Sequence, residues 1–188
     1  MTLQKAGSEV EYTITYLEMA ERPGWVWPHL PTGAQALLLK AEEPPVWWFI
    51  ALYDAVGRDY AWQDIHAREE DEIEAWLGAD AMTLYTLYGK GWPQGFFLLE
   101  DTPEGVVDLA YFGLVPEAVG QGLGTWLLKT AILTAWDQPG AKRLTVNTCT
   151  LDHPRALQTY QTHGFQPVGQ ETRTRILTRD RDLSRIPT

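Results

Sequence analysis

The glycines around residue 122 are the part of the sequence whose composition and spacing best suit ligand chemistry. The stretch Val119-Gly120-Gln121-Gly122-Leu123-Gly124-Thr125 lies between an apolar run, 106–115, and a helical pattern, 126–136. A glycine turn between a strand and a helix exposes backbone N–H groups at the positive end of the helix dipole. Glycine also lets an anion approach the backbone closely. The stretch therefore predicts a site for a phosphorylated ligand.

Several kinds of phosphate site can be compared with this stretch. No Gly-Lys-Ser/Thr follows the glycines, which excludes a Walker loop. The dinucleotide fingerprint fits poorly, because Thr125 stands at its third glycine position and the next expected strand, 143–149, ends without an acid. Judged alone, the glycines are equally compatible with a plain turn at a helix start.

A second motif lies about thirty residues further on, from His153 to Phe165. Asp152 or His153 can cap a helix whose first position suits Pro154. Positions 156, 157 and 160 share one helical face, Gly164 ends the helix, and Phe165 starts a strand.

Together the two motifs resemble those of the GNAT superfamily of acyl-CoA-dependent N-acyltransferases. In that superfamily the loop reads Arg/Gln-x-x-Gly-x-Gly/Ala, and the later helix reads Asn-x-x-Ala-x-x-x-Tyr-x-x-x-Gly-Phe. The matching residues of this chain are Gly122, Gly124, Ala156, Tyr160, Gly164 and Phe165.

Two residues depart from the family pattern. Val119 stands where Arg or Gln is usual, and His153 stands where Asn is usual. Gln121 is a candidate replacement for the missing side-chain donor, and His153 keeps a ring that can form hydrogen bonds.

The resemblance implies acetyl-CoA as co-substrate. The loop would hold the pyrophosphate, the backbone of 113–115 would pair with the pantetheine arm, and an N–H near Phe112 would stabilise the oxyanion. The implied cofactor-binding residues are Phe112, Gly113, Leu114, Val115, Val119, Gly120, Gln121, Gly122, Leu123, Gly124, Thr125, His153, Ala156 and Tyr160.

Two residues are predicted to be catalytic. The resemblance gives Tyr160 the role of protonating the departing thiolate or donating a hydrogen bond to it; the alternative is a core aromatic. Asp108 is the predicted base, because a carboxylate inside an apolar strand is costly unless it is paired or used. Strand alternation would place Asp108, Ala110, Phe112 and Leu114 on one face. The alternatives for Asp108 are a solvent-edge position and a water chain as base.

Aromatic and acidic residues alternate in the loop after the first expected helix. Aromatic rings beside carboxylates can form the wall of an ammonium site, and in GNAT folds this loop commonly lines the acceptor site. Asp59, Tyr60, Trp62 and Asp64 are therefore predicted to contact the acceptor. An ordinary surface loop with one buried Trp is the alternative.

Other reactive residues have no such context. Cys149 lies in an expected strand and is interpreted as a small buried residue rather than a nucleophile. The histidines lack metal-ligand spacing, so no metal is predicted; they are His29, His66, His153 and His163.

Composition narrows the class of partner. The 188 residues have a formal net charge of -10 and a pI near 4.8, which argues against nucleic acid and suits a cationic amine. A single cysteine fits a reducing cytosol. The start lacks a signal-peptide pattern and no apolar run is long enough to span a membrane, so a cytoplasmic protein is predicted. By analogy with the superfamily, a homodimer is possible.

The hydrophobic pattern defines the elements that must hold these residues. Strands are expected at 10–18, 82–88, 94–100, 106–114, 143–149, 165–168 and 173–178, and helices at 46–56, 69–77, 126–136 and from 154; 36–40 fits a strand or a helix start. This order predicts an α/β (α+β) fold with a GNAT-like mixed, mostly antiparallel central sheet flanked by helices. One domain would span 1–188, with 179–188 as a solvated tail.

The sequence thus predicts an N-acetyltransferase that moves an acetyl group from acetyl-CoA to a small cationic or aromatic amine in a ternary complex. Two alternatives stay open: a non-catalytic GNAT-fold module that binds acyl-CoA or a peptide, and a nucleotide-binding protein of unrelated fold.

Overall fold

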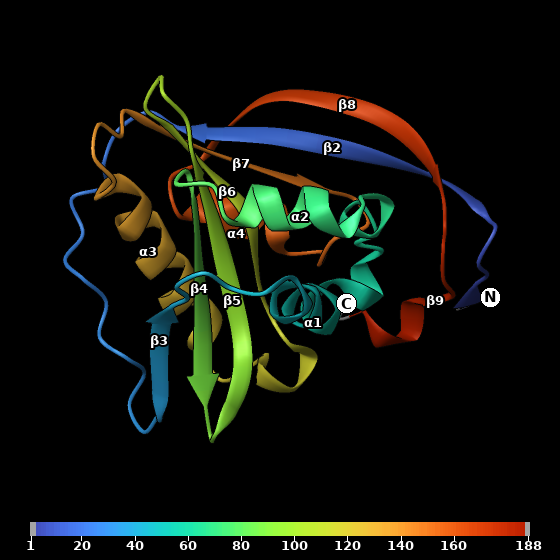
Figure 1. The fold of residues 1–188 in the computed structure, drawn as a ribbon, viewed down its shortest axis with the longest axis horizontal. Helices are drawn as coiled ribbons and strands as arrows, with labels where there is room; N and C mark the ends of the chain where they lie inside the picture. Colours follow the sequence, from blue (N-terminus) through green and yellow to red (C-terminus); the bar gives the residue numbers. More distant parts are fainter. Residues whose placement is uncertain (1–2, 187–188) are drawn as a thin grey trace.

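The computed structural model describes residues 3–186, which fold around one mixed sheet with helices on both faces (Figure 1). The sheet order is β3-β4-β5-β6-β7-β2-β8. Its strands are β2 (Glu9–Met19), β3 (Ala36–Lys40), β4 (Met82–Gly89), β5 (Trp92–Asp101), β6 (Val106–Leu114), β7 (Arg143–Cys149) and β8 (Gln166–Ile176), and a separate pair joins β1 (Leu3–Gln4) to β9 (Arg181–Asp182).

The sheet divides into two wings between β6 and β7. These strands form the parallel pair of the sheet, and their ladder covers only Val106–Asp108 against Arg143–Thr145. Beyond it the strands diverge, with β3 to β6 in one wing and β7, β2 and β8 in the other (Figure 1). Residues 109–114 of β6 are left with one strand neighbour, β5.

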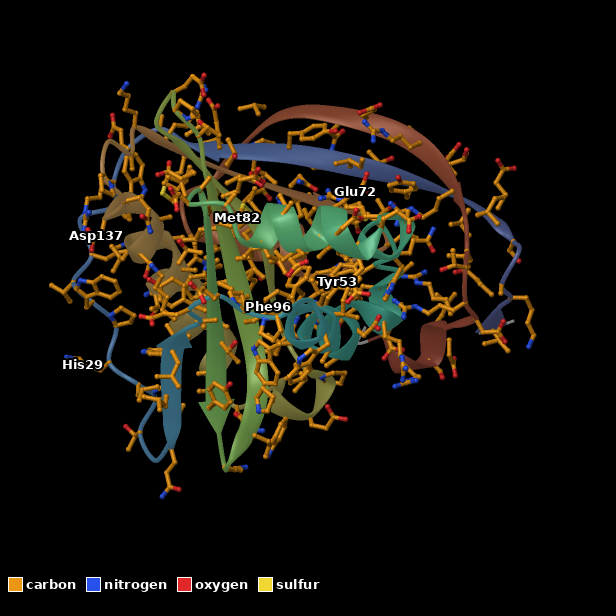
Figure 2. The ribbon with its side chains drawn as sticks, viewed as in Figure 1. His29, Tyr53, Glu72, Met82, Phe96 and Asp137 are labelled. Atoms are coloured by element: carbon orange, nitrogen blue, oxygen red, sulfur yellow. The ribbon has the colours of Figure 1, made fainter. Side chains whose placement is uncertain are left out.

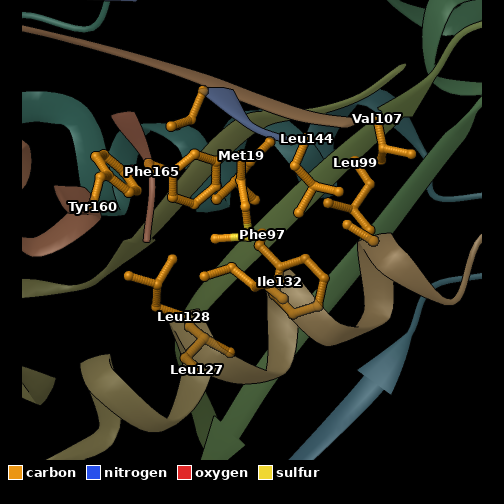
Figure 3. Packing of buried hydrophobic residues seen from close by; sticks show 14 of the residues in the cluster. Met19, Phe97, Leu99, Val107, Leu127, Leu128, Ile132, Leu144, Tyr160 and Phe165 are labelled. Atoms are coloured by element: carbon orange, nitrogen blue, oxygen red, sulfur yellow. The ribbon is translucent and has the colours of Figure 1, made fainter. Parts of the chain in front are cut away.

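Helices cover both faces and bury a hydrophobic core on each. Phe49 of α1 and Phe96 of β5 meet on one face, where Tyr53 is also buried (Figure 2). Leu128 and Ile132 of α3 pack against the sheet on the other face (Figure 3). The helices are α1 (Val46–Gly57), α2 (Glu70–Leu77), α3 (Leu123–Trp136) and α4 (Ala156–Thr162), with 3₁₀ turns η1 (Arg58–Tyr60), η2 (Ile65–Ala67), η3 (Pro116–Ala118) and η4 (Leu183–Arg185).

Local sequence explains several of these elements. A reciprocal capping box between Glu69 and Glu72 starts α2. At Gly113 a side chain would meet Val56 of α1, since an added Cβ would lie 2.3 Å from its Cγ1. Glycine therefore allows α1 to pack directly on β6 at the rim of the sheet division.

The predicted fold class is confirmed: the sheet is mixed, mostly antiparallel, and flanked by helices. Residues 36–40 form a strand, which is one of the two alternatives given for them. Other boundaries differ from the expected elements: the two strands expected at 165–168 and 173–178 are one continuous strand, the helix expected at 126–136 begins at Leu123, and the last helix begins at Ala156 rather than Pro154. β2, from the start of the chain, lies between β7 and β8 and pairs with both.

The end of the chain is packed, which corrects the expectation of a solvated tail over 179–188. Arg181 is 7% exposed. Its guanidinium donates to the carbonyl oxygens of Asp59 and Leu151 and to the side-chain oxygen of Gln4. Residues 187 and 188 lie outside the described part of the chain. Arg181 thus joins three distant segments, including the turn that follows β7.

Replacing Arg181 should destabilise the fold. Arg181→Ala leaves three oxygen acceptors without their donors, which is expected to cost roughly 2 to 4 kcal/mol in the free energy of unfolding. Urea unfolding measures this cost. Arg173→Ala is the control, because the Arg173 side chain is 51% exposed and its loss should change stability by less than about 0.5 kcal/mol. Equal, small effects would show that the tail adds nothing to stability.

Candidate active site

The division of the sheet opens a cavity of about 590 Å³ between β6 and β7. Its wall combines β6, the glycine loop, the end of β7, α4 and the loop after α1. Most predicted site residues meet on this wall: Tyr60, Trp62, Asp64, Phe112, Gly113, Leu114, Val119, Gly120, Gly122, Gly124, Thr125, His153, Ala156 and Tyr160.

The glycine loop ends in an uncapped helix. Gly120 and Gly122 have φ values of 84° and 77°, in the left-handed region that favours glycine. The N-cap residue of α3, Gly122, makes no side-chain capping bond, and no acidic residue lies in the first turn. The first N–H groups of a helix have no intrahelical acceptor. This end of the cavity is therefore suited to an anion.

Three predicted loop residues lie off the wall. The Gln121 side chain donates to the Glu117 carbonyl oxygen at 2.9 Å, and its role as a replacement for the donor missing at Val119 stays a prediction. Val115 and Leu123 are 4% and 3% exposed and belong to the hydrophobic core. Contacts from Val115 and Leu123 to a ligand are thereby limited to the backbone.

Tyr160 is held by two aromatic rings at the edge of the core (Figure 3). Its ring centroid lies 6.4 Å from that of Phe112 and 5.8 Å from that of Phe165. Burial, followed by the charges of Asp152 and Asp108, raises the pKa of the phenol. Within residues 3–186 no hydrogen-bond partner satisfies its hydroxyl, which belongs to a cavity-lining residue. The phenol thus stays protonated and able to donate.

Asp108 lies off the cavity wall, contrary to the face predicted for it. The β5–β6 register pairs Leu99 with Leu109 and Leu98 with Tyr111, so Ala110 is an extra, bulged residue. A bulge reverses strand alternation, and it separates Asp108 from Phe112. The Asp108 carboxylate accepts a hydrogen bond from Thr145, and burial raises its pKa. Its role as base stays a prediction that this position does not support.

The loop after α1 brings aromatic rings and a carboxylate to the cavity. Asp64 accepts hydrogen bonds from the hydroxyl groups of Tyr53, at 2.8 Å, and Tyr111. Trp62 lies against Tyr111, with ring centroids 5.3 Å apart. Asp59, predicted as an acceptor contact, instead forms an ion pair with Arg185 at 3.3 Å and lies off this wall.

Asp152 is a wall residue that the sequence-based site prediction missed. Its carboxylate accepts from Trp62 Nε1 at 3.1 Å, Thr148 Oγ1 at 2.7 Å and the Cys149 N–H at 2.8 Å. The sequence suggested only a helix cap. An acid directly after a strand and before the second motif was the available signal, because strand ends commonly carry site residues in such folds.

His153 and Cys149 complete this part of the wall. His153 Nδ1 accepts the Arg155 N–H at 3.1 Å, which leaves the proton on Nε2; burial and the Arg155 charge lower the His153 pKa. Burial and the Asp152 charge raise the pKa of the Cys149 thiol to about 11. A thiol with this pKa is a poor nucleophile at neutral pH.

Over residues 3–186, no cluster of three or more His, Cys, Asp or Glu is arranged to hold a metal ion. No helix in the same range is long and apolar enough to cross a membrane. The cytoplasmic location, the absence of a nucleic-acid partner and the homodimer stay predictions.

Comparison with known proteins identifies a family match. A family model described as acetyltransferase (GNAT) family matches residues 47–165. No curated protein matches the chain by sequence.

Solved structures share the fold at low identity. A GCN5-related N-acetyltransferase from Kribbella flavida is 18% identical with a TM-score of 0.56, covering 86% of this chain and 56% of that one. One from Sphaerobacter thermophilus is 14% identical with a TM-score of 0.59, covering 93% and 53%. An aminoglycoside acetyltransferase from an uncultured soil metagenomic sample, in complex with sisomicin, is 11% identical with a TM-score of 0.56, covering 68% and 86%. The chain thus spans little more than half the length of the first two.

The variant Asp108→Asn should show whether the Asp108 carboxylate acts as the catalytic base or only lowers stability because it is buried. Burial raises the pKa of Asp108 in the folded state. Above that pKa the folded protein carries a buried charge, which lowers the free energy of unfolding; below the pKa of Asp108 in the unfolded chain the carboxyl group is neutral in both states, and this cost is absent. The variant should therefore melt higher than wild type at about pH 8, and the gain should vanish near pH 3. Its acetyl-transfer rate should stay within about tenfold of wild type, whereas loss of a base costs roughly 100-fold or more. That larger loss would restore Asp108 as the base.

Proposed function

The chain belongs to the acetyltransferase (GNAT) family, and on that premise we propose that it transfers an acetyl group from acetyl-CoA to a small amine. The observation that carries the proposal is the strand edge of β6 beside the uncapped start of α3. One cavity wall combines this edge, the helix start and the Tyr160 phenol. A thioester substrate with a phosphate-bearing tail needs these three features together.

The two ends of acetyl-CoA require different partners. The pyrophosphate would bind the N–H groups at residues 120–125, where glycine backbone and the helix dipole favour an anion. The pantetheine amides would bind the free edge of β6, since residues 109–114 have a strand neighbour only on the β5 side. Val119 does not weaken this proposal, because backbone groups supply the contacts.

Acyl transfer then needs one bond formed and one broken. The neutral amine nitrogen attacks the thioester carbonyl carbon, a backbone N–H near Phe112 would stabilise the oxygen that gains charge, and the carbon–sulfur bond breaks. The amine's extra proton passes to water in the open cavity. Because the Tyr160 pKa is raised, full proton transfer to the sulfur is uphill. Tyr160 would therefore donate a hydrogen bond to the thiolate, which solvent later protonates.

The acceptor would bind where rings and carboxylates meet. Tyr60, Trp62 and Asp64 lie on the cavity wall, and an ammonium group is attracted both to aromatic faces and to carboxylates. This supports a small cationic or aromatic amine as acceptor.

Acetyl-CoA should stabilise the protein against heat. At about a hundred times its Kd, a ligand adds roughly 2.7 kcal/mol, a rise of about 5 to 10 °C in Tm for a chain of this size. Gly122→Ala should lose most of this rise, whereas Gly33→Ala should keep it. Both glycines have positive φ, 77° and 81°, but only Gly122 lines the cavity. No rise with acetyl-CoA or CoA, or a larger rise with NAD, would contradict the proposal.

Tyr160→Phe should slow turnover without abolishing cofactor binding. Loss of a hydrogen bond to a charged leaving group should lower kcat roughly 10- to 100-fold, with the Tm rise from acetyl-CoA kept. Thiol release with an amine acceptor measures kcat. Tyr85→Phe is the control, because Tyr85 stacks on Phe97 away from the cavity. An unchanged kcat in the Tyr160 variant would make Tyr160 a core aromatic and favour a binding module without catalysis.

A further inference from the structure

A guanidinium lies on the acceptor side of the cavity wall, where a site for purely cationic amines has no use for it. Arg175 of β8 lines the cavity. Its Nη1 donates to the Ala61 carbonyl oxygen and its Nη2 to the Tyr12 hydroxyl, both at 2.9 Å, and its Cζ lies 4.3 Å from the Tyr12 ring centroid. These contacts fix the planar group while leaving other N–H donors of the guanidinium for a ligand.

A carboxylate of opposite sign lies close to this guanidinium. Asp152, on the same wall, is oriented by three donors. Both charges are tied to adjacent residues of the loop after α1, because Arg175 donates to the Ala61 carbonyl oxygen and Asp152 accepts from the Trp62 indole N–H. The acceptor side of the cavity thus presents a fixed anion and a fixed cation that both hold this short stretch of loop.

The remaining charges on the wall are placed differently. Asp64 accepts its hydrogen bonds from Tyr53 and Tyr111, whereas Asp152 accepts from Trp62, the residue that follows the Ala61 carbonyl to which Arg175 donates. Arg155 belongs to the turn before α4, in the second motif, on the side proposed for the cofactor. The His153 ring lies 6.1 Å from that of Tyr60, but its lowered pKa leaves it without a charge at neutral pH. Asp152 and Arg175 are therefore the pair available to two charged groups of one acceptor.

Building on the proposed function, we propose that the acceptor is a small zwitterion, an amine that also carries a carboxylate. Asp152 would attract the ammonium group before it loses its proton, and Arg175 would bind the carboxylate through its fork of donors. Tyr60 and Trp62 would contact an apolar or aromatic remainder. Arg175 would also repel diamines and polyamines, which gives the site selectivity.

Matched acceptors that differ in the carboxylate test this proposal. Thiol release with acetyl-CoA gives kcat/KM for phenylalanine against phenylalanine amide, tyrosine against tyramine, and 5-aminopentanoate against 1,5-diaminopentane. In at least one pair, kcat/KM should be about tenfold or more higher for the acceptor that carries the carboxylate, because its partner leaves the Arg175 guanidinium without an anion.

Variants then assign the preference to Arg175. Arg175→Gln should lower kcat/KM for the carboxylate member at least about tenfold more than for its partner, and Arg175→Lys should recover part of the difference. Arg173→Gln on the same strand, whose side chain is 51% exposed and paired with Glu171, should leave the preference intact. Thermal unfolding confirms that each variant is folded.

Several results would overturn the inference. The first is an equal kcat/KM for the two acceptors of every pair. The second is an equal loss of kcat/KM for both acceptors of a pair in Arg175→Gln. The third is a preference for succinyl-CoA over acetyl-CoA as acyl donor that Arg175→Gln removes. The last would assign Arg175 to the acyl donor. A protein that acetyl-CoA stabilises, but that shows no carboxylate preference, overturns only this inference. A protein that acetyl-CoA does not stabilise overturns the proposed function as well.

Discussion

The divergence of β6 from β7 after a short parallel ladder is the constraint on which the site depends. Continued pairing would consume the β6 edge and leave no cavity between the wings. The bulge at Ala110 lies just where the ladder ends, and it turns the rest of β6 so that Phe112 meets Tyr160. The same division places the start of α3 at one end of the cavity and the loop after α1 at the other.

Residues distant in the chain hold these two ends in place. β2 completes the second wing between β7 and β8, so the beginning of the chain supplies part of the cavity wall through Tyr12. Arginines from the C-terminal part donate to carbonyl oxygens of the loop after α1: Arg175 to Ala61, Arg179 to Trp62 and Arg181 to Asp59. A buried carbonyl oxygen needs a donor, and the loop has no regular partner strand to supply one. Its shape therefore depends on this C-terminal part.

Predictions that rest on local rules agree with the structure. The glycine turn before a helix, the helix that ends near Gly164 and most strand positions follow from backbone preferences and from hydrophobic periodicity. Predictions that assumed regular geometry over longer distances fail. Alternation along β6 placed Asp108 on the face of Phe112, but one bulged residue reverses it. Polarity placed Asp59 in the acceptor site, yet Arg185, more than a hundred residues away, pairs with it.

By itself, then, the sequence determined most of the elements, the glycine turn before α3 and the family, because each depends on neighbours a few residues apart. Only the tertiary structure decided which polar side chains share one wall. Asp152 and Arg175 come from the turn after β7 and from β8, and no periodicity links them. Their positions follow from the pairing of β2 with β7 and β8 and from buried hydrogen bonds between distant segments, which a linear pattern does not contain.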